Sequence, residues 1–429
     1  MPSRLSGRAL AGWSLAAAAM ALAACSDGGS NEKGASGAAA DASAGASQSV
    51  AASADANQPP TPALPPNAAA MSGPQAAGDA GAPVGSAPTG AAAATPAAQP
   101  APPPPPATTD PRAVAINSAG PTTKARAGAW SPALVRAQVL LGRARFSPGV
   151  IDGREGDNFH RALAAFETAH GETADGRLHA DVWSALTSAD SAPVVTSYVI
   201  TAADVAGPFS PAVPEDDLVA LSKLKRVGYT SAQEMLAERF HMDKGLLEAL
   251  NPGADFGAAG TRILVASFPA QAPAMQVRTI EVDKTARQVR AFDGGGKLLA
   301  TYPATVGSTE RPAPSGEFKV KGVAHDPTYT YDPKRLTYGD KALGKVVVPP
   351  GPNNPVGVIW IALNIPTYGI HGAPDPTLVG KTASHGCVRL TNWDIEDLAS
   401  GVKPGVKVVF VGSAAAAKGA GKSARRARG

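Results

Sequence analysis

The chain has 429 residues, of which 46 are Gly and 40 are Pro, and only 5% are aromatic. A single hydrophobic core stops growing at about 250 residues, so this length and composition indicate several domains and a part that cannot fold. The net charge is +4, but five of the 39 basic residues lie in a tail at 413–429 that we expect to be disordered. The other 34 basic residues face 35 acidic ones, and this near-neutral body excludes a dedicated nucleic-acid groove.

Residues 1–24 have the pattern of an export signal. Arg4 and Arg8 precede an apolar stretch at 9–21 that is too short to cross about 30 Å of hydrocarbon. The next residues, Leu-Ala-Ala-Cys, end at Cys25 and resemble the bacterial lipobox, which implies that this thiol carries a lipid and anchors the chain to a membrane. By analogy with that class of lipoproteins, Ser rather than Asp after Cys25 implies the outer membrane if the host has one. An ordinary secreted protein, cleaved nearby, is the alternative.

Residues 25–124 consist mainly of Ala, Pro, Gly, Ser and Thr. They cannot bury a core, so we predict a disordered linker that lets a membrane-anchored domain search a polymer layer. Cysteine usage adds a second inference. If Cys25 carries a lipid, it cannot form a disulfide with the only other cysteine, Cys387, which is then a candidate reactive thiol in an export compartment.

The first folded module is expected at 125–190. Apolar residues at helical spacing predict three short amphipathic helices, and they are Val135, Val139, Leu140, Phe159, Leu163, Phe166, Trp183 and Leu186. Asp-Gly pairs at 152–153 and 175–176 mark the turns. This pattern resembles the small peptidoglycan-binding domain, and a helical module without a ligand is the alternative. Three histidines lack metal-ligand spacing and are expected at surface or capping positions: His160, His170 and His179.

A second module is expected at 191–270. Ser231 and Asp243 are placed to cap two helices, and an apolar strand is expected at 263–265. The stretch MLAERFHMDKGLLEALNPG followed by GTRILVA resembles a LysM module, which implies binding of glycans that contain N-acetylglucosamine. The expected opening strand at 198–201 is separated from the first helix by an insertion of about 30 residues, which departs from that pattern.

From 275 to 412 the pattern changes to short strands separated by Gly and Pro turns. The expected strands are 277–282, 288–292, 297–305, 316–323 and 356–363. A tight hairpin is predicted at the Asp-Gly-Gly-Gly of 293–296. Many short strands and few helices predict a mostly antiparallel sandwich or barrel-like domain. The chain is therefore expected to be multidomain, with this mostly β domain preceded by a three-helix domain and a small α+β module.

Two clusters with chemical potential, YGIHGAP and SHGCVRL, follow on this β scaffold. His371 lies 16 residues before Cys387, which is enough chain for a loop to bring the imidazole beside the thiol and raise its reactive fraction. Amides near Gly386 suit a developing oxyanion, and Arg389 suits a carboxylate. Zinc binding is disfavoured, because a single cysteine has no CxxC partner. These residue types therefore predict an acyl-transfer site.

With RPAPSGEFKV upstream, the two clusters resemble the L,D-transpeptidase catalytic domain of the YkuD type over about 135 residues. The resemblance implies that Cys387 is the nucleophile and His371 the base, held in its tautomer by a backbone carbonyl near Gly372. It assigns the oxyanion pocket to three consecutive residues, Ser384, His385 and Gly386. Arg389 would order the site or bind the donor stem. His385 is an alternative base, because it is close to the thiol in sequence.

The resemblance implies attack on the carbonyl of the third residue of a tetrapeptide stem, release of the terminal D-alanine, and a thioester that an amine of another stem converts to a 3→3 cross-link. No metal or organic cofactor is expected. The expected partners are peptidoglycan stem peptides and glycan, with a membrane reached through the N-terminal lipid, on the periplasmic side of a bacterial envelope. Two alternatives stay open: the same chemistry could attach or release a lipoprotein at the wall, or the chain could be an inactive wall-binding lipoprotein.

Overall fold

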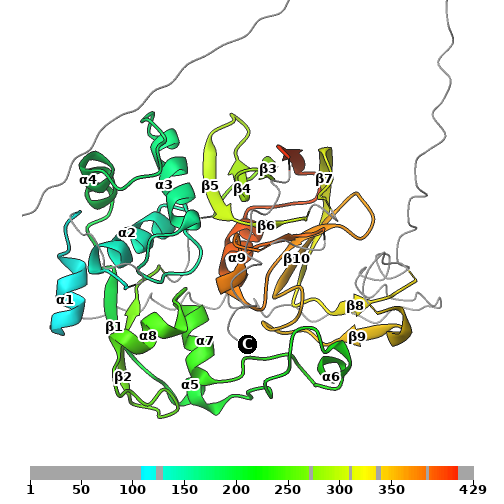
Figure 1. Ribbon diagram of the computed structural model, residues 1–429, viewed down its shortest axis with the longest axis horizontal. Coiled ribbons are helices and arrows are strands. Elements are labelled where there is room, and N and C mark those ends of the chain that lie inside the picture. Colours follow the sequence, from blue (N-terminus) through cyan, green and yellow to red (C-terminus); the bar gives the residue numbers. More distant parts are fainter. Residues whose placement is uncertain are drawn as a thin grey trace, which may run out of the picture. The chain divides into compact units, whose positions relative to one another are not determined.

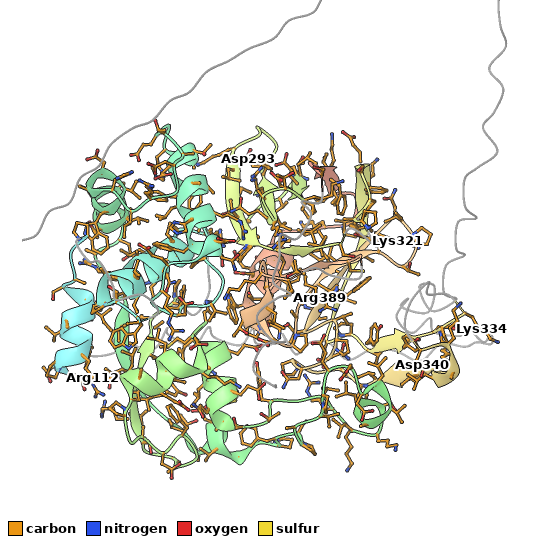
Figure 2. The ribbon with its side chains drawn as sticks, viewed as in Figure 1. Arg112, Asp293, Lys321, Lys334, Asp340 and Arg389 are labelled. Carbon is orange, nitrogen blue, oxygen red and sulfur yellow. The ribbon has the colours of Figure 1, made fainter. Side chains whose placement is uncertain are left out.

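The computed structural model describes residues 108–121, 129–269, 274–308, 312–334, 340–382 and 386–413. Figure 1 shows the elements and Figure 2 adds the side chains. The helices are α1 (Pro111–Asn117), α2 (Pro132–Arg143), α3 (Asp157–Ala169), α4 (Ala180–Ala189), α5 (Ala202–Ala206), α6 (Leu218–Ser222), α7 (Ala232–Arg239), α8 (Lys244–Leu250) and α9 (Asn392–Ser400). Within these ranges no helix is both long enough and apolar enough to span a membrane. The expected signal peptide with Cys25 and all but one residue of the basic tail lie outside them.

The described residues contain two strands in the α+β module and eleven in the region at 275–412, called the catalytic region because its sequence predicts the active site. They are β1 (Val195–Val199), β2 (Arg262–Ala266), β3 (Thr279–Asp283), β4 (Gln288–Phe292), β5 (Leu298–Pro303), β6 (Thr305–Val306), β7 (Gly316–His325), β8 (Tyr329–Tyr331), β9 (Val346–Val348), β10 (Ile359–Leu363), β11 (Gly369–His371), β12 (Val388–Arg389) and β13 (Lys407–Val411). Two short 3-10 helices are η2 (Lys341–Leu343) and η3 (Pro376–Leu378).

The three predicted helices of the first module are confirmed as α2, α3 and α4, and their apolar faces are buried. The turn before α4 requires glycine, because Gly176 has a φ of +68° and a Cβ there would lie 2.6 Å from the His160 carbonyl oxygen. All three histidines of the module are exposed, as expected. His170 and His179 occupy the C-cap of α3 and the N-cap of α4.

A helix precedes this module where the sequence predicted only linker. The prediction of disorder over 25–124 was wrong for α1, which buries Ala113 and Ile116 and packs against α2 and β1. The Asn117 side chain donates to the Val195 carbonyl oxygen at 2.9 Å and accepts from the Val195 amide at the same distance. Seven residues are too short for a stable isolated helix, so α1 depends on these tertiary partners, which composition does not reveal.

The second module is a small α+β unit. β1 and β2 pair antiparallel, and α7 and α8 lie between them in sequence. Both predicted caps are confirmed, since Ser231 accepts from the Glu234 amide at 3.1 Å and Asp243 accepts from the Leu246 amide at the same distance. The opening strand, expected at 198–201, is β1 and begins earlier. The predicted insertion contains α5 and α6.

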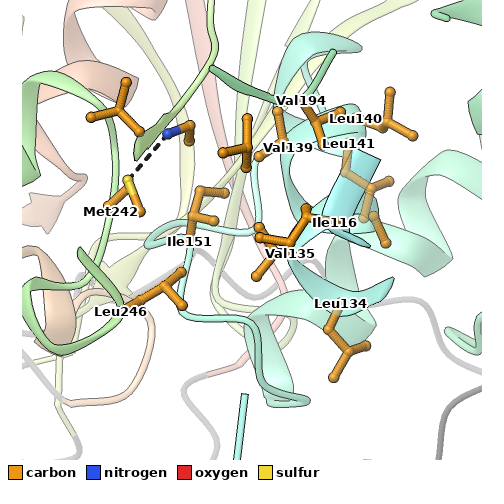
Figure 3. Close-up of a cluster of buried hydrophobic side chains, with 14 of the residues drawn as sticks. Ile116, Leu134, Val135, Val139, Leu140, Leu141, Ile151, Val194, Met242 and Leu246 are labelled. Atoms are coloured by element: carbon orange, nitrogen blue, oxygen red, sulfur yellow. Dashed lines mark hydrogen bonds between the residues drawn. The ribbon is translucent and has the colours of Figure 1, made fainter. Parts of the chain in front are cut away.

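The helical and α+β modules share one hydrophobic core. Figure 3 shows Met242 and Leu246 of the second module close to Ile151 and Val135 of the first, and all four residues belong to one buried cluster. The Met242 sulfur also accepts from the Ala266 amide at 3.2 Å. The predicted division near residue 190 is therefore a change of architecture within one continuous core, and the two modules are expected to unfold together.

The catalytic region forms a nine-stranded sheet in the order β5-β4-β3-β13-β7-β10-β11-β12-β6. Its first and last strands, β5 and β6, are separated in sequence only by Ala304, so the sheet must curl until its ends approach one another. Six of its eight strand pairs are antiparallel, and β3–β13 and β11–β12 are parallel. The prediction of a mostly β, mostly antiparallel and barrel-like domain is confirmed.

The predicted hairpin between β4 and β5 is also confirmed, with the Asp293 amide donating to the Lys297 carbonyl oxygen at 3.0 Å. α9 packs against β10 and β11 and buries Ile395 and Leu398 in the core of the sheet (Figure 1). This packing supports the β11–β12 end of the sheet, where the candidate active site lies.

Candidate active site

The positions of the candidate nucleophile and base follow from the register of two short parallel strands. β11 pairs with β12 so that Ile370 lies opposite Val388 and His371 lies opposite Arg389. Cys387 immediately precedes β12. Side chains two residues apart on a strand share a face, and in-register neighbours on adjacent strands share it too. The register therefore places His371 and Arg389 on one face of the sheet, and Cys387 lies in the bend directly before β12. Figure 2 labels Arg389 at this position.

The imidazole of His371 is buried and fixed. Its side chain stacks on Trp360 with ring centroids 5.3 Å apart, and Nδ1 lies 2.6 Å from the Gly372 carbonyl oxygen. A carbonyl only accepts, so Nδ1 carries the hydrogen and Nε2 keeps its lone pair. Burial, and to a smaller extent the positive charge of Arg389, lower the pKa of His371 to about 3. The ring is therefore neutral near pH 7 and able to accept a proton at Nε2.

The thiol of Cys387 is held in its protonated form. Burial raises its pKa, while a backbone hydrogen bond from Gly369 and the charge of Arg389 oppose that rise. The thiol lies 3.7 Å from the Thr367 carbonyl oxygen, to which it donates. Because both thiol and imidazole are neutral at rest, a base must take the thiol proton during attack rather than before it.

Gly386, directly before the nucleophile, is held by Tyr368. The Tyr368 hydroxyl donates to the Gly386 carbonyl oxygen, and the Tyr368 ring packs against Phe410. Gly386 has a φ of +130°, a conformation that favours glycine. The sequence did not predict this hydrogen bond, because no local pattern links Tyr368 with Gly386. The predicted oxyanion residues Ser384 and His385 lie outside the described residues.

A second residue that the sequence did not single out, Asn392, supports the loop behind His371. A Cβ at Gly372 would lie 2.2 Å from the Asn392 side-chain oxygen, so only glycine fits there. The Asn392 amide group donates to Glu238 Oε1 at 2.8 Å and to the Pro352 carbonyl oxygen at 3.1 Å. Burial raises the pKa of Glu238 to about 7, despite the opposing hydrogen bond from Asn392. Helix α7 of the preceding module thus contacts the loop next to the candidate base, His371.

Asp375, four residues after His371, has its own local partners. It accepts from the Thr377 hydroxyl at 2.6 Å and from the Thr377 amide at 2.9 Å. Within the described ranges no three His, Cys, Asp or Glu side chains are grouped as potential metal ligands.

Comparison with known proteins identifies the same region. A family model described as the L,D-transpeptidase catalytic domain, YkuD, matches residues 277–411. A protein of Bacillus licheniformis named as L,D-transpeptidase YkuD is 30% identical over 177 residues, covering 41% of this chain and 90% of that protein. One of Escherichia coli K12 named as L,D-transpeptidase YbiS is 29% identical over 192 residues, covering 43% of this chain and 61% of that protein.

Among solved structures, an L,D-transpeptidase from Xylanimonas cellulosilytica is 16% identical, with a TM-score of 0.30 over 66% of this chain and 95% of that one. The sequence matches are decisive, because the family model spans both clusters of the site and the Bacillus protein is matched along nearly its whole length. The chain belongs to the L,D-transpeptidase family of the YkuD type.

Proposed function

We propose that this chain is a peptidoglycan L,D-transpeptidase that works through a thioester on Cys387. The observation that carries the proposal is the pairing of β11 with β12, which sets His371 opposite Arg389 and brings the end of β11 beside the strand that Cys387 directly precedes. The charge of Arg389 acts on the pKa of both His371 and Cys387. A thiol near a neutral imidazole whose other nitrogen is fixed is the arrangement that nucleophilic acyl transfer requires. Membership of the family supports peptidoglycan as the substrate class.

In the first half-reaction the thiol proton moves to Nε2 of His371 while sulfur attacks the carbonyl carbon of the third residue of a tetrapeptide stem. The carbonyl electron pair moves onto oxygen, and we assign the pocket for this oxyanion to the loop formed by Ser384, His385 and Gly386. When the intermediate collapses, the carbon–nitrogen bond breaks and the amine of D-alanine takes the proton from Nε2. A thioester remains on Cys387.

In the second half-reaction an amine of another stem gives its proton to Nε2 of His371 and attacks the thioester. A new amide forms, the carbon–sulfur bond breaks, and the thiolate takes the proton back. The proposed product is a 3→3 cross-link. No metal or organic cofactor enters this scheme, and Arg389 pairs with a carboxylate of the donor.

The proposed setting is the periplasmic side of a bacterial envelope. Residues 1–24 would act as a signal peptide, and a lipid on Cys25 would anchor the chain at the outer of two membranes. The stretch of chain between Cys25 and α1 would then let the folded region reach the wall. We assign wall binding to the three-helix module and glycan binding to the LysM-like module, on their resemblance alone.

The test is intact-mass spectrometry of the full chain after incubation with a disaccharide tetrapeptide. The wild type should gain the mass of the donor minus D-alanine and should release D-alanine. Cys387→Ala should do neither, whereas Cys25→Ala, the matched control at the other cysteine, should react as the wild type does. A folded wild type with a titratable thiol that forms no adduct would refute the enzyme and leave a wall-binding lipoprotein.

The identity of the acyl acceptor is tested in cells from which the gene for this chain has been deleted. Loss of 3→3 dimers from the muropeptide profile would support the cross-linking reaction. Loss of wall-bound protein with 3→3 dimers unchanged would contradict it, and would assign the same thioester chemistry to lipoprotein attachment. Complementation with the wild type and with Cys387→Ala separates the reaction from any binding role of the chain.

A further inference from the structure

The insertion of the α+β module, between β1 and α7, packs onto the catalytic region. Leu221 of α6 and Val227 form a small hydrophobic cluster with Tyr331 of β8 and with Val346 and Val348 of β9. All five side chains are at most 9% exposed. The β8–β9 hairpin has no other buried apolar cluster among the described residues, so the insertion completes its core.

Backbone contacts fix the insertion more closely than apolar packing alone. The Val227 amide donates to the Pro350 carbonyl oxygen at 2.9 Å, and a Cβ at Gly351 would lie 2.1 Å from the Val227 carbonyl oxygen. Arg226 makes two hydrogen bonds with the Asp326 carboxylate, one of them at 2.8 Å. A segment held by an ion pair, backbone hydrogen bonds and a shared core has a defined position on the catalytic region.

This position brings an acidic side chain to the active site. Glu215 precedes α6, and its Oε1 lies 3.6 Å from Nη1 of Arg389. Glu215 and Arg389 line one small cleft together with Thr305 and Asp375. Arg389 lies two residues after Cys387 and opposite His371, so an acid of one module reaches the candidate active site of another. Both members of the pair are partly exposed, with 39% of the Glu215 side chain and 29% of the Arg389 side chain accessible.

The Glu215 carboxylate lies beside Arg389, where a carboxylate of the donor would have to bind. A guanidinium recognises a carboxylate best through two parallel hydrogen bonds, and Glu215 at 3.6 Å is close enough to compete but too far for such a bond. An anionic donor must therefore displace Glu215 from Arg389, whereas a donor with a neutral carboxamide at the same position need not. Exposed ion pairs contribute only about 0.2–1 kcal/mol, so displacement is possible at a small cost.

We propose that Glu215 is a specificity-determining residue of the active site, which disfavours donors that present a carboxylate to Arg389 relative to donors that present a carboxamide. This inference rests on the proposed transpeptidase function. It also makes the insertion a functional part of the catalytic unit rather than a spacer within the preceding module.

The experiment measures KM and kcat for D-alanine release by the full chain with matched tetrapeptide donors. Each free carboxylate of the donor is replaced in turn by a carboxamide. Each replacement gives a pair of donors that differ at one carboxylate. For the pair that differs at the group facing Arg389, Glu215→Gln should lower KM for the carboxylate donor by about two- to fivefold and leave KM for the carboxamide donor unchanged. Glu215→Asp, which keeps the charge on a shorter side chain, should give an intermediate ratio.

Asp216→Asn is the matched control, because it removes the same charge from the neighbouring exposed position, which does not line the cleft. It should leave every ratio of KM values unchanged. The inference would be overturned if Glu215→Gln changed KM equally for the carboxylate and carboxamide donors, or changed KM for no pair of donors. Failure of the wild type to release D-alanine from every donor would instead refute the proposed function.

Discussion

The candidate active site combines residues that reach it in two different ways. His371 and Arg389 are set opposite each other by the register of β11 and β12, and Cys387 directly precedes β12. Glu215 comes from an insertion that is held on the catalytic region by side-chain packing, backbone hydrogen bonds and an exposed ion pair. Under the two proposals, the paired strands therefore carry the reacting groups, and a segment distant in sequence influences which donor binds.

The largest effect on activity is expected from a substitution in the paired strands β11 and β12. His371→Ala removes the base, and acylation at pH 7 should fall by about 10²–10⁴-fold. The deficit should shrink as the pH rises toward the thiol pKa, because the thiolate then forms without a base. Stopped assays of D-alanine release from pH 6 to pH 10 measure this. His325→Ala, at an exposed histidine of β7, is the control, and a deficit that stays constant with pH would contradict the assignment of the base.

The next effect concerns the core of the insertion. Leu221 is 2% exposed, and Leu221→Ala should cost about 2–3 kcal/mol of stability by leaving a cavity under the β8–β9 hairpin. Thermal unfolding measures the loss. Val219→Ala, on the exposed side of the same helix, should change stability little. A loss of stability without any rise in proteolysis near the hairpin would argue against the shared core.

Glu238 connects the α+β module with the candidate active site. It belongs to α7, and its carboxyl accepts a hydrogen bond from Asn392, which supports the loop behind His371. Burial raises its folded-state pKa to about 7, above its usual value of 4.5. The protonated form therefore contributes stability below pH 4.5 that is lost as the pH rises through 7. Glu238→Gln abolishes this titration, so the stability of the variant relative to the wild type should increase by about 2 kcal/mol between pH 5 and pH 8.

Denaturation curves at both pH values check this prediction. Glu248→Gln, the same substitution at an exposed glutamate of α8, is the matched control. A pH-independent difference for Glu238→Gln would show that the Glu238 carboxyl is ionised in the fold across this range.

The smallest effect is expected at the exposed ion pair that anchors the insertion. Arg226→Ala should reduce global stability by less than about 1 kcal/mol, because the Arg226 and Asp326 side chains are 49% and 44% exposed. Its local effect should be larger, with faster hydrogen exchange at the amides of Val227 and Asn353, which bond across this contact. Arg112→Ala, at another partly exposed Arg–Asp pair, should leave these amides unchanged.

The elements with a distinctive local pattern could be predicted from the amino-acid sequence. Helical spacing identified α2, α3 and α4, the cap residues Ser231 and Asp243 located α7 and α8, and the glycines at 293–296 located a hairpin. It did not identify β11 and β12, because two or three residues are too few to show alternation, and it missed α1, whose helix needs partners from β1. β13 was also not assigned, although KVVFV has the composition of a strand.

For the site, the motifs alone gave Cys387, His371 and Arg389, because chemistry restricts the residue types that can act as nucleophile, base and anion ligand. The folded chain was needed to show that a module preceding the catalytic region contributes Glu215 to the cleft and Glu238 to the loop behind His371. Neither glutamate stands in a pattern that distinguishes it from other surface acids. Their positions follow from packing between segments distant in sequence, which local residue order does not encode.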